Sequence, residues 1–136
     1  MKRRDARQAA FVLIFNKDFN FDEPCSEILT RAIECENLEK YDNDPYVSRV
    51  FSGVFEHLEE IDSEIDKASI HWNADRISRV SRAILRLAVY EIKYEDDIPT
   101  KIAVNEAVEL AKKFDDEKAF SFVNGILGAI ATDFDN

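Results

Sequence analysis

Apolar residues recur along most of this chain at steps of three and four, the spacing that places them on one face of an α-helix. The clearest run has apolar residues at positions 47, 50, 51, 54, 55, 58, 61 and 65, with glutamates between them. This run predicts one long amphipathic helix over about 45–65. Similar spacing predicts further helices over about 4–16, 24–37, 80–94, 100–113 and 119–134.

Turn-forming residues are scarce, since the whole chain has three glycines and three prolines. A β-protein of this length needs more of them. Asn43 or Asp44 suits the start of the long helix as its cap, and Pro45 suits its first turn. We therefore expect an all-α protein of six to seven helices, in which Gly125 and Gly128 let another backbone approach closely.

Composition places the chain among globular proteins, because 46% of its 136 residues are hydrophobic and this length supports one domain with a real core. No run approaches the roughly 20 apolar residues of a membrane helix. The start is basic and then apolar, as in a signal peptide, but its apolar part is short and has no convincing cleavage site. We expect a cytoplasmic protein without a membrane segment.

Groups for catalysis or metal binding are too few to form a site. Cys25 and Cys35 do not have the spacing of a redox pair or a zinc ligand set. His57 and His71 are the only histidines and lie apart in the sequence. A weak metal site of His57 with nearby glutamates is less plausible than a solvated helix face. No phosphate-binding glycine loop occurs. We expect no enzymatic activity, no catalytic residue, no metal and no cofactor.

Charge is distributed unevenly along the chain. The net charge is −10, but residues 1–17 hold five basic residues and one acidic residue, a net of +4, so the remainder carries −14. A local basic patch on an acidic body can bind RNA at a defined place. On a helical wheel Arg3, Arg4 and Arg7 share one side and lead into Phe11 and Phe15. The alternative is a solvated terminus with both phenylalanines in the core.

A second basic stripe lies in the helix expected over 80–94. Arg79, Arg82 and Arg86 fall within a narrow arc, opposite the apolar residues. The stripe either meets RNA or an acidic partner, or forms salt bridges with Glu106, Glu109 or acids of the long helix; we favour the salt bridges, most strongly for Arg86. Glu91 falls among the apolar positions, where a buried carboxylate needs a donor.

The last predicted helix carries an aromatic residue at the edge of its apolar face. Phe122 lies about a quarter-turn from that face, near Lys118 and Gly125. An aromatic ring in this position either stacks on a nucleic-acid base or completes the edge of the core.

Three blocks of the sequence point to one family. They are RRDAR at 3–7, AILRLAVYEI at 83–92, and IPTKIAVNEAVELAKKF with FVNGIL at 98–114 and 122–127. Together these blocks resemble the NusB family of bacterial transcription antitermination factors. The resemblance implies a single all-α domain over 1–136, with helical subdomains of about 1–72 and 73–136, and no enzymatic activity.

The resemblance also implies partners. Family members bind the boxA element of ribosomal RNA transcripts as a heterodimer with NusE, a ribosomal protein. The complex joins RNA polymerase with NusA and NusG, and family members occur both as monomers and as homodimers. A different function remains open at this point, namely a helical protein-interaction or assembly module without direct RNA contact.

The resemblance assigns roles to particular residues. The residues implied to bind RNA are Lys2, Arg3, Arg4, Arg7, Lys118 and Phe122, and those implied to bind the partner protein are Phe15, Ser81 and Arg82. The sequence departs from the family pattern in two places. Asp5 interrupts a short basic tract, and Ser121 stands where a basic residue often precedes the aromatic, which suggests weak RNA affinity without the partner.

Overall fold

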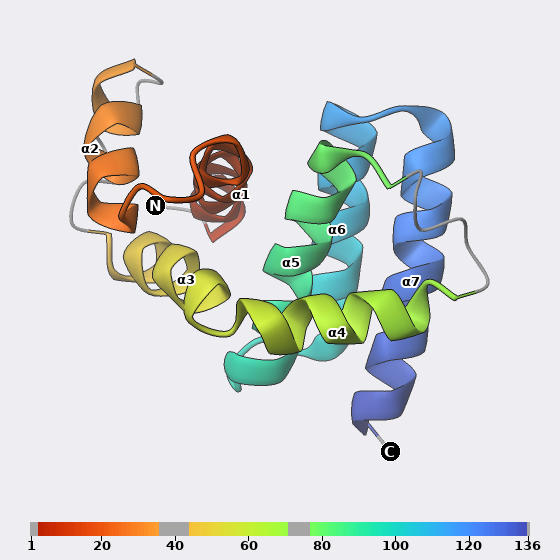
Figure 1. The fold of residues 1–136 in the computed structure, drawn as a ribbon. Helices are drawn as coiled ribbons and strands as arrows, with labels where there is room; N and C mark the ends of the chain where they lie inside the picture. The colour runs from red at the N-terminus through yellow and green to blue at the C-terminus, as the bar shows by residue number, and fades with distance from the viewer. Residues whose placement is uncertain (1–2, 36–43, 71–76, 136) are drawn as a thin grey trace.

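The computed structural model describes residues 3–35, 44–70 and 77–135, and its ordered elements there are all helices (Figure 1). The seven helices are α1 (Arg3–Phe19), α2 (Cys25–Cys35), α3 (Pro45–Glu56), α4 (Leu58–Ala68), α5 (Arg79–Tyr94), α6 (Thr100–Phe114) and α7 (Glu117–Asp135). The all-α prediction is confirmed. Lys2, which the sequence assigns to RNA binding, lies outside the described residues.

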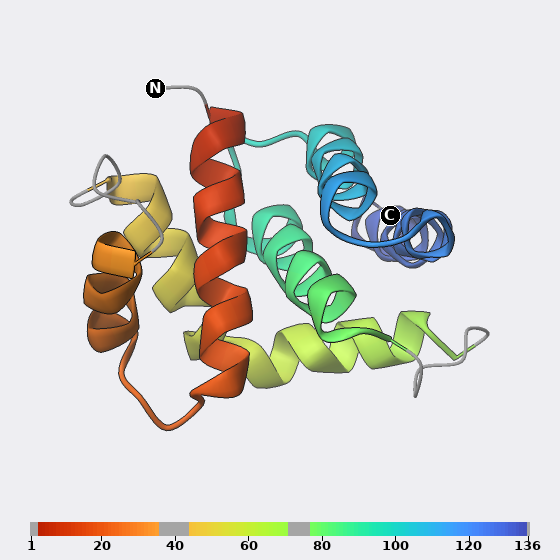
Figure 2. The same ribbon diagram turned by 90° about the horizontal axis from the view of Figure 1, so that it is seen from above.

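The helices form two groups that meet along α1 and α5. Figures 1 and 2 show α1 with α2 and α3 on one side and α5, α6 and α7 on the other. Helix α4 crosses α5 and α7, and packs against both. The N-terminal turn of α1 lies beside α6, from which it is separated by about 100 residues in the sequence. The predicted division into subdomains near residue 72 stays a prediction.

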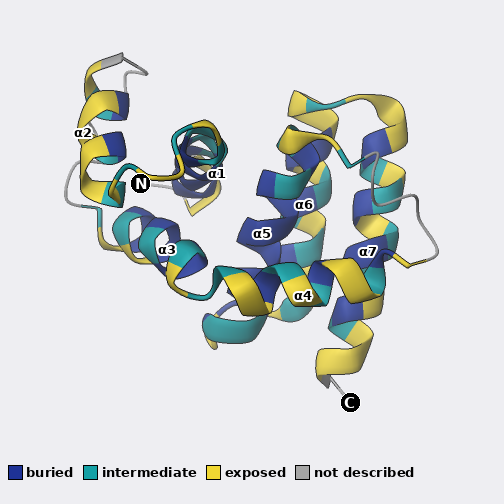
Figure 3. Cartoon of the chain, in the orientation of Figure 1, coloured by how far each residue is buried: buried dark blue, intermediate teal, exposed yellow. Residues whose placement is uncertain are grey.

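Helix α5 is the centre of the core. Every residue from Ala83 to Ile92 is buried, and Figure 3 shows α5 mostly dark blue beyond its exposed first turn. Helix α1 packs against α5. Small residues of α1, including Ala6 and Ala10, allow a close approach, and both are at most 3% exposed. A helix buried on all sides has no solvent-facing stripe for its charged residues. Arg86 and Glu91 of α5 must therefore find charged partners inside the fold.

The long helix predicted over 45–65 is wrong as a single element, because it breaks at His57 into α3 and α4. His57 leaves helical geometry at φ −111° and ψ 21°. Its ring stacks on Tyr94 of α5, with 4.2 Å between ring centroids. The apolar spacing continues through the break, so periodicity alone does not reveal it. The start of α3 is confirmed: the Asp44 carboxylate accepts from the N–H groups of Tyr46 and Val47.

Close packing at a glycine occurs at Gly53, which the sequence did not single out. A Cβ built on Gly53 would lie 2.4 Å from Cε2 of Tyr90, so the tyrosine ring rests against the α3 backbone. A Cβ on Gly128 would meet nothing within 4 Å. The expected close approach at Gly128 is therefore wrong.

None of the helices in the described part of the chain is both long enough and apolar enough to cross a lipid bilayer.

Candidate nucleic-acid interface

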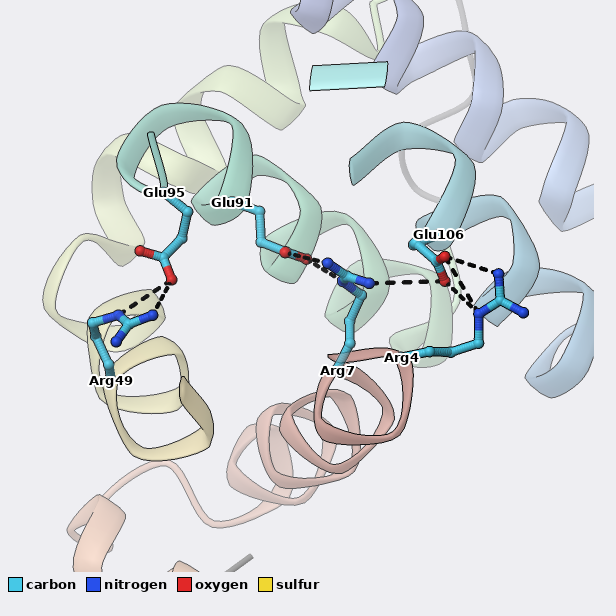
Figure 4. Close-up of polar contacts among 6 residues, drawn as sticks. All are labelled: Arg4, Arg7, Arg49, Glu91, Glu95 and Glu106. Atoms are coloured by element: carbon cyan, nitrogen blue, oxygen red, sulfur yellow. Dashed lines mark hydrogen bonds and ion pairs between the residues drawn. The ribbon is translucent and has the colours of Figure 1, made fainter. Parts of the chain in front are cut away.

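The first turn of α1 carries two exposed arginines. The guanidinium of Arg3 lies over the Tyr46 ring, 4.4 Å from its centroid. The Arg4 side chain is 70% exposed and pairs with Glu106 of α6. Its Nε and Nη2 donate to the Glu106 carboxylate over 2.9–3.3 Å (Figure 4). That hydrogen bond and the charge of Glu106 raise the pKa of Arg4.

Arg7, one turn further along α1, is buried. It is 4% exposed, and its Nε and Nη2 donate to the two carboxylate oxygens of Glu91 at 2.7 and 2.9 Å. Burial lowers the pKa of Arg7, but the hydrogen bond and charge of Glu91 outweigh it and the net shift is upward. The predicted need of Glu91 for a donor is confirmed. The burial of Arg7 argues against a direct phosphate contact from this residue.

The two pairs form one chain of alternating charges from the surface to the core. Glu106 is 16% exposed and lies 3.8 Å from Nη1 of Arg7 as well as bonding Arg4 (Figure 4). Tyr46 of α3 borders the inner end, where burial and then the Glu91 carboxylate raise the pKa of its hydroxyl. Two of the three arginine charges on α1 are therefore balanced by glutamates within the protein.

A groove runs from this turn of α1 between α6 and α7. It has a volume of about 670 Å³, and its lining includes Arg4, Asn105, Glu106, Lys112, Phe120 and Asn124. Its α7 residues are Phe120, Ser121 and Asn124. Successive helical residues turn by about 100°, so Phe122 lies roughly 160° around α7 from Phe120. The structure therefore does not bring Phe122 into the groove that Arg4 borders.

Phe122 and Lys118 share the other flank of α7, because they lie one turn apart. Phe122 is partly buried and packs against the core, whereas Lys118 is exposed. Sequence reasoning missed Phe120 as a site residue. The signal was available, because Phe120 lies as far from the centre of the apolar face of α7 as Phe122 does, on the opposite side.

Phe15, assigned to partner binding, belongs to a row of aromatic rings. Ring centroids are 5.0 Å apart for Phe114 and Phe11, 6.2 Å for Phe11 and Phe15, and 5.0 Å for Phe15 and Phe19. Phe19 is 55% exposed, and the guanidinium of Arg79 lies 4.6 Å from its centroid. The row from Phe114 through Phe11 and Phe15 to Phe19, here the aromatic row, is buried at Phe11, half-buried at Phe15 and exposed at both ends.

Ser81, also assigned to partner binding, is completely buried. Its hydroxyl donates to Asp115 at 2.7 Å, and the hydroxyl of Ser78, the N-cap of α5, donates to the same carboxylate oxygen. Burial raises the pKa of Asp115, but these hydrogen bonds outweigh it and the pKa is lowered. The Ser81 side chain therefore ties α5 to the α6–α7 turn and does not reach a partner's surface.

The arginine stripe of α5 is paired with acids. Arg86 donates to both oxygens of Asp62 at 3.0 Å and to Asp18 at 3.2 Å, which confirms the structural interpretation for this residue. The neighbouring ion pairs are Arg79 with Asp18 at 3.7 Å and Arg82 with Asp66 at 3.3 Å. Arg82 keeps 23% of its side chain exposed, so part of it stays accessible to a partner.

Comparison with known proteins gives one consistent result. A family model described as the NusB family matches residues 4–132. The transcription antitermination protein NusB of Bacillus subtilis is 43% identical over 135 residues, covering 99% of this chain and 98% of that protein. The structure of T. maritima NusB has a TM-score of 0.85 and 37% identity, over 97% of this chain and 92% of that one.

One similar structure includes other molecules. It is a crystal structure of the antitermination factors NusB and NusE in complex with double-stranded RNA. Its matching chain has a TM-score of 0.83 and 34% identity, covering 96% of each chain.

Proposed function

Because this chain belongs to the NusB family, we propose that it is a transcription antitermination factor that binds boxA-type single-stranded RNA together with NusE. This is a binding role and not an enzymatic one. Bound in this way, it supports transcription of ribosomal RNA in the cytoplasm, within a complex of RNA polymerase, NusA and NusG.

The observation that carries the RNA part of the proposal is the cationic turn at the start of α1. Arg3 and Arg4 are exposed there, on a chain whose net charge is −10. An arginine fork matches a phosphate in charge and in geometry. The acidic remainder disfavours phosphates elsewhere on the surface, so RNA is directed to this turn. Lys2 precedes it in the sequence and adds to the same tract. Arg7 supports the turn from inside through Glu91.

Phe122 and Lys118 supply the second RNA contact in this proposal. An aromatic ring stacks on bases that are unpaired, and a lysine beside it attracts the adjacent phosphate. The strand then passes from the α1 turn to the far flank of α7. Contacts from NusE extend the surface, so that the pair holds an RNA that either protein binds weakly alone.

The aromatic row and the exposed part of Arg82 are our proposed NusE contacts. Phe15 lies in this row, and the exposed ends Phe19 and Phe114 present apolar area of the kind that protein interfaces bury. In the absence of NusE, the same apolar area can pair two copies of the chain. Light scattering of the chain with and without NusE measures whether binding of NusE and pairing of two copies of this chain exclude each other.

The double variant Arg3→Ala/Arg4→Ala is expected to weaken binding of a labelled boxA-type RNA at least several-fold without unfolding the domain, because both side chains are exposed. Binding is measured by fluorescence anisotropy with and without NusE. With about four phosphate contacts, the slope of log affinity against log salt is expected near −3, and shallower in the variant. An unchanged affinity would remove the α1 turn from the interface, and a slope near zero would contradict phosphate binding.

Phe122→Ala is expected to weaken RNA binding by roughly five- to a hundredfold, because base stacking on an aromatic ring contributes about 1–3 kcal/mol per base. The melting temperature of the variant is measured alongside the affinity, since Phe122 also packs against the core. A large drop in melting temperature with RNA affinity retained at low temperature would identify Phe122 as a core residue only.

A protein-interaction module without RNA contact is the second candidate, favoured by the pairing of Arg4 and Arg7 with glutamates and by the exposed ends of the aromatic row. Pull-down of NusE with and without nuclease separates the two functions. Association that survives nuclease, together with no binding of free boxA-type RNA by the purified pair, would favour the module.

A further inference from the structure

The groove between α1, α6 and α7 places Arg4 beside groups that the proposed function leaves unused. Its volume of about 670 Å³ lies within the range of about 300–1,000 Å³ that is usual for ligand sites. Asn105 and Glu106 face it from α6, Phe120 and Asn124 from α7, and Arg4 from α1. Figure 2 shows the start of α1 beside α6, and α6 beside α7.

The groove offers an aromatic face and two amides to a base. The Phe120 ring is partly exposed, and the Lys112 ammonium lies over it at 5.4 Å from the centroid. Asn105 and Asn124 are exposed, and neither side-chain amide has a hydrogen bond to another residue in the part of the chain that the structure describes. Each amide presents both donors and an acceptor. This combination suits an unpaired base, which stacks by its face and bonds by its edge.

Arg4 and Glu106 form a charged pair in the lining of the groove. The Glu106 carboxylate occupies the fork of Arg4, the same geometry in which arginine holds a phosphate. Glu106 also lies 3.8 Å from Arg7. If Arg4 turns to a phosphate, Glu106 keeps that second arginine as its partner. The exchange therefore does not leave a largely buried carboxylate without a countercharge, which would be costly.

We propose that this groove is a nucleotide subsite in which an RNA phosphate replaces Glu106 as the partner of Arg4 while the attached base stacks on Phe120. The edge of the base bonds to Asn105 or Asn124. Glu106 thereby opposes RNA binding in the free protein and sets its affinity. The inference rests on the proposed function and adds to it a site, the contact residues Phe120, Asn105 and Asn124, and a contact of Arg4 that competes with the RNA.

Glu106→Gln is expected to bind the labelled boxA-type RNA roughly two- to fivefold more tightly, because it weakens the hold on Arg4. Asp5→Asn is the matched control. Asp5 is an exposed acid next to Arg4 and has no ion pair with a described cation, so its variant makes the same charge change near the RNA and releases no arginine. If RNA affinity rises no more in Glu106→Gln than in Asp5→Asn, the proposed exchange of Glu106 for a phosphate at Arg4 is overturned.

Repeating both changes in an Arg4→Gln background isolates the release of Arg4 from the general change in charge. In the Arg4→Gln background, Glu106→Gln is expected to raise RNA affinity no more than Asp5→Asn does. An extra gain that persists without Arg4 would show that Glu106 acts by long-range repulsion alone, and would overturn the exchange. Melting temperatures of all the variants confirm that they are folded at the titration temperature.

Phe120→Leu tests the stacking half of the subsite, because leucine keeps apolar volume and removes the ring. We expect RNA affinity to fall at least fivefold. The control is Phe134→Leu, which removes a ring that is 51% exposed near the other end of α7 and is expected to leave the affinity for RNA unchanged. Equal effects of the two changes would overturn the assignment of Phe120.

The outcomes also separate this inference from the proposed function. Failure of the wild-type chain to bind boxA-type RNA, alone or with NusE, would defeat both. Wild-type binding that depends on Arg3 and Arg4, combined with wild-type affinity in Phe120→Leu and no extra gain in Glu106→Gln, would defeat the subsite and leave the proposed function standing.

Discussion

Glu91→Leu is expected to lower the free energy of unfolding by about 3–5 kcal/mol, because it leaves the Arg7 guanidinium buried without its carboxylate. Arg7 and Glu91 are 4% and 1% exposed, and two hydrogen bonds of 2.7 and 2.9 Å join them. For a chain of this size the melting temperature should fall by more than about 10 °C. Thermal and urea unfolding followed by circular dichroism measure both quantities.

The double variant Arg7→Met/Glu91→Leu is the matched test of the cause. Replacing a buried ion pair by apolar residues of similar volume is often neutral or stabilising, so the double variant is expected to recover most of the loss. Arg4→Gln, which breaks an exposed pair on the same helix, should change stability little. If Glu91→Leu melts near the wild-type temperature, Arg7 reaches solvent without its partner, and the pair does not hold α1 against α5.

This pair also matters for the candidate interface. It joins α1, which carries Arg3 and Arg4, to α5, the centre of the core. Glu106 of α6 bonds Arg4 and lies beside Arg7, so the position of the exposed arginines depends on the buried pair. We therefore expect the folded fraction of Arg7→Met/Glu91→Leu to bind RNA more weakly than the wild type, because the buried pair no longer positions Arg3 and Arg4.

Gly53→Ala is expected to destabilise the protein by up to about 2 kcal/mol net, although alanine favours helices. The added Cβ would lie 2.4–2.6 Å from three atoms of the Tyr90 side chain, and Tyr90 is itself 6% exposed. Overpacking of a core position usually costs about 1–3 kcal/mol, which exceeds the gain in helix propensity of about 0.5–1 kcal/mol. Urea unfolding of the two proteins gives the difference directly.

Gly128→Ala is the matched control for Gly53→Ala, with the opposite expected sign. Position 128 lies within α7, and a Cβ there meets nothing within 4 Å. The gain in helix propensity should therefore appear almost undiminished, as a stabilisation of about 0.5–1 kcal/mol. Should Gly53→Ala also stabilise the protein, the Tyr90 ring can move aside freely and the close contact is not a constraint on the fold.

Several parts of this protein follow from its sequence alone. Local spacing determined the helices, because a buried helical face requires apolar residues every three to four positions. The burial of Glu91 and its need for a donor also followed, since a carboxylate within an apolar stripe has no access to water. The three sequence blocks determined the family, which the comparisons confirmed over nearly the whole chain.

Other parts needed the tertiary structure because they depend on what lies across from a residue. The break at His57 and the close contact of Gly53 both lie against tyrosines of α5, about forty residues away. Spacing placed Arg7 beside Arg3 and Arg4, yet only the position of Glu91 on α5 decided that Arg7 is buried while the others stay exposed. In the same way, Phe120 and Phe122 are equivalent on a helical wheel. The packing of α7 against α6 decided which of them faces the groove, because a wheel gives directions around a helix and not its neighbours.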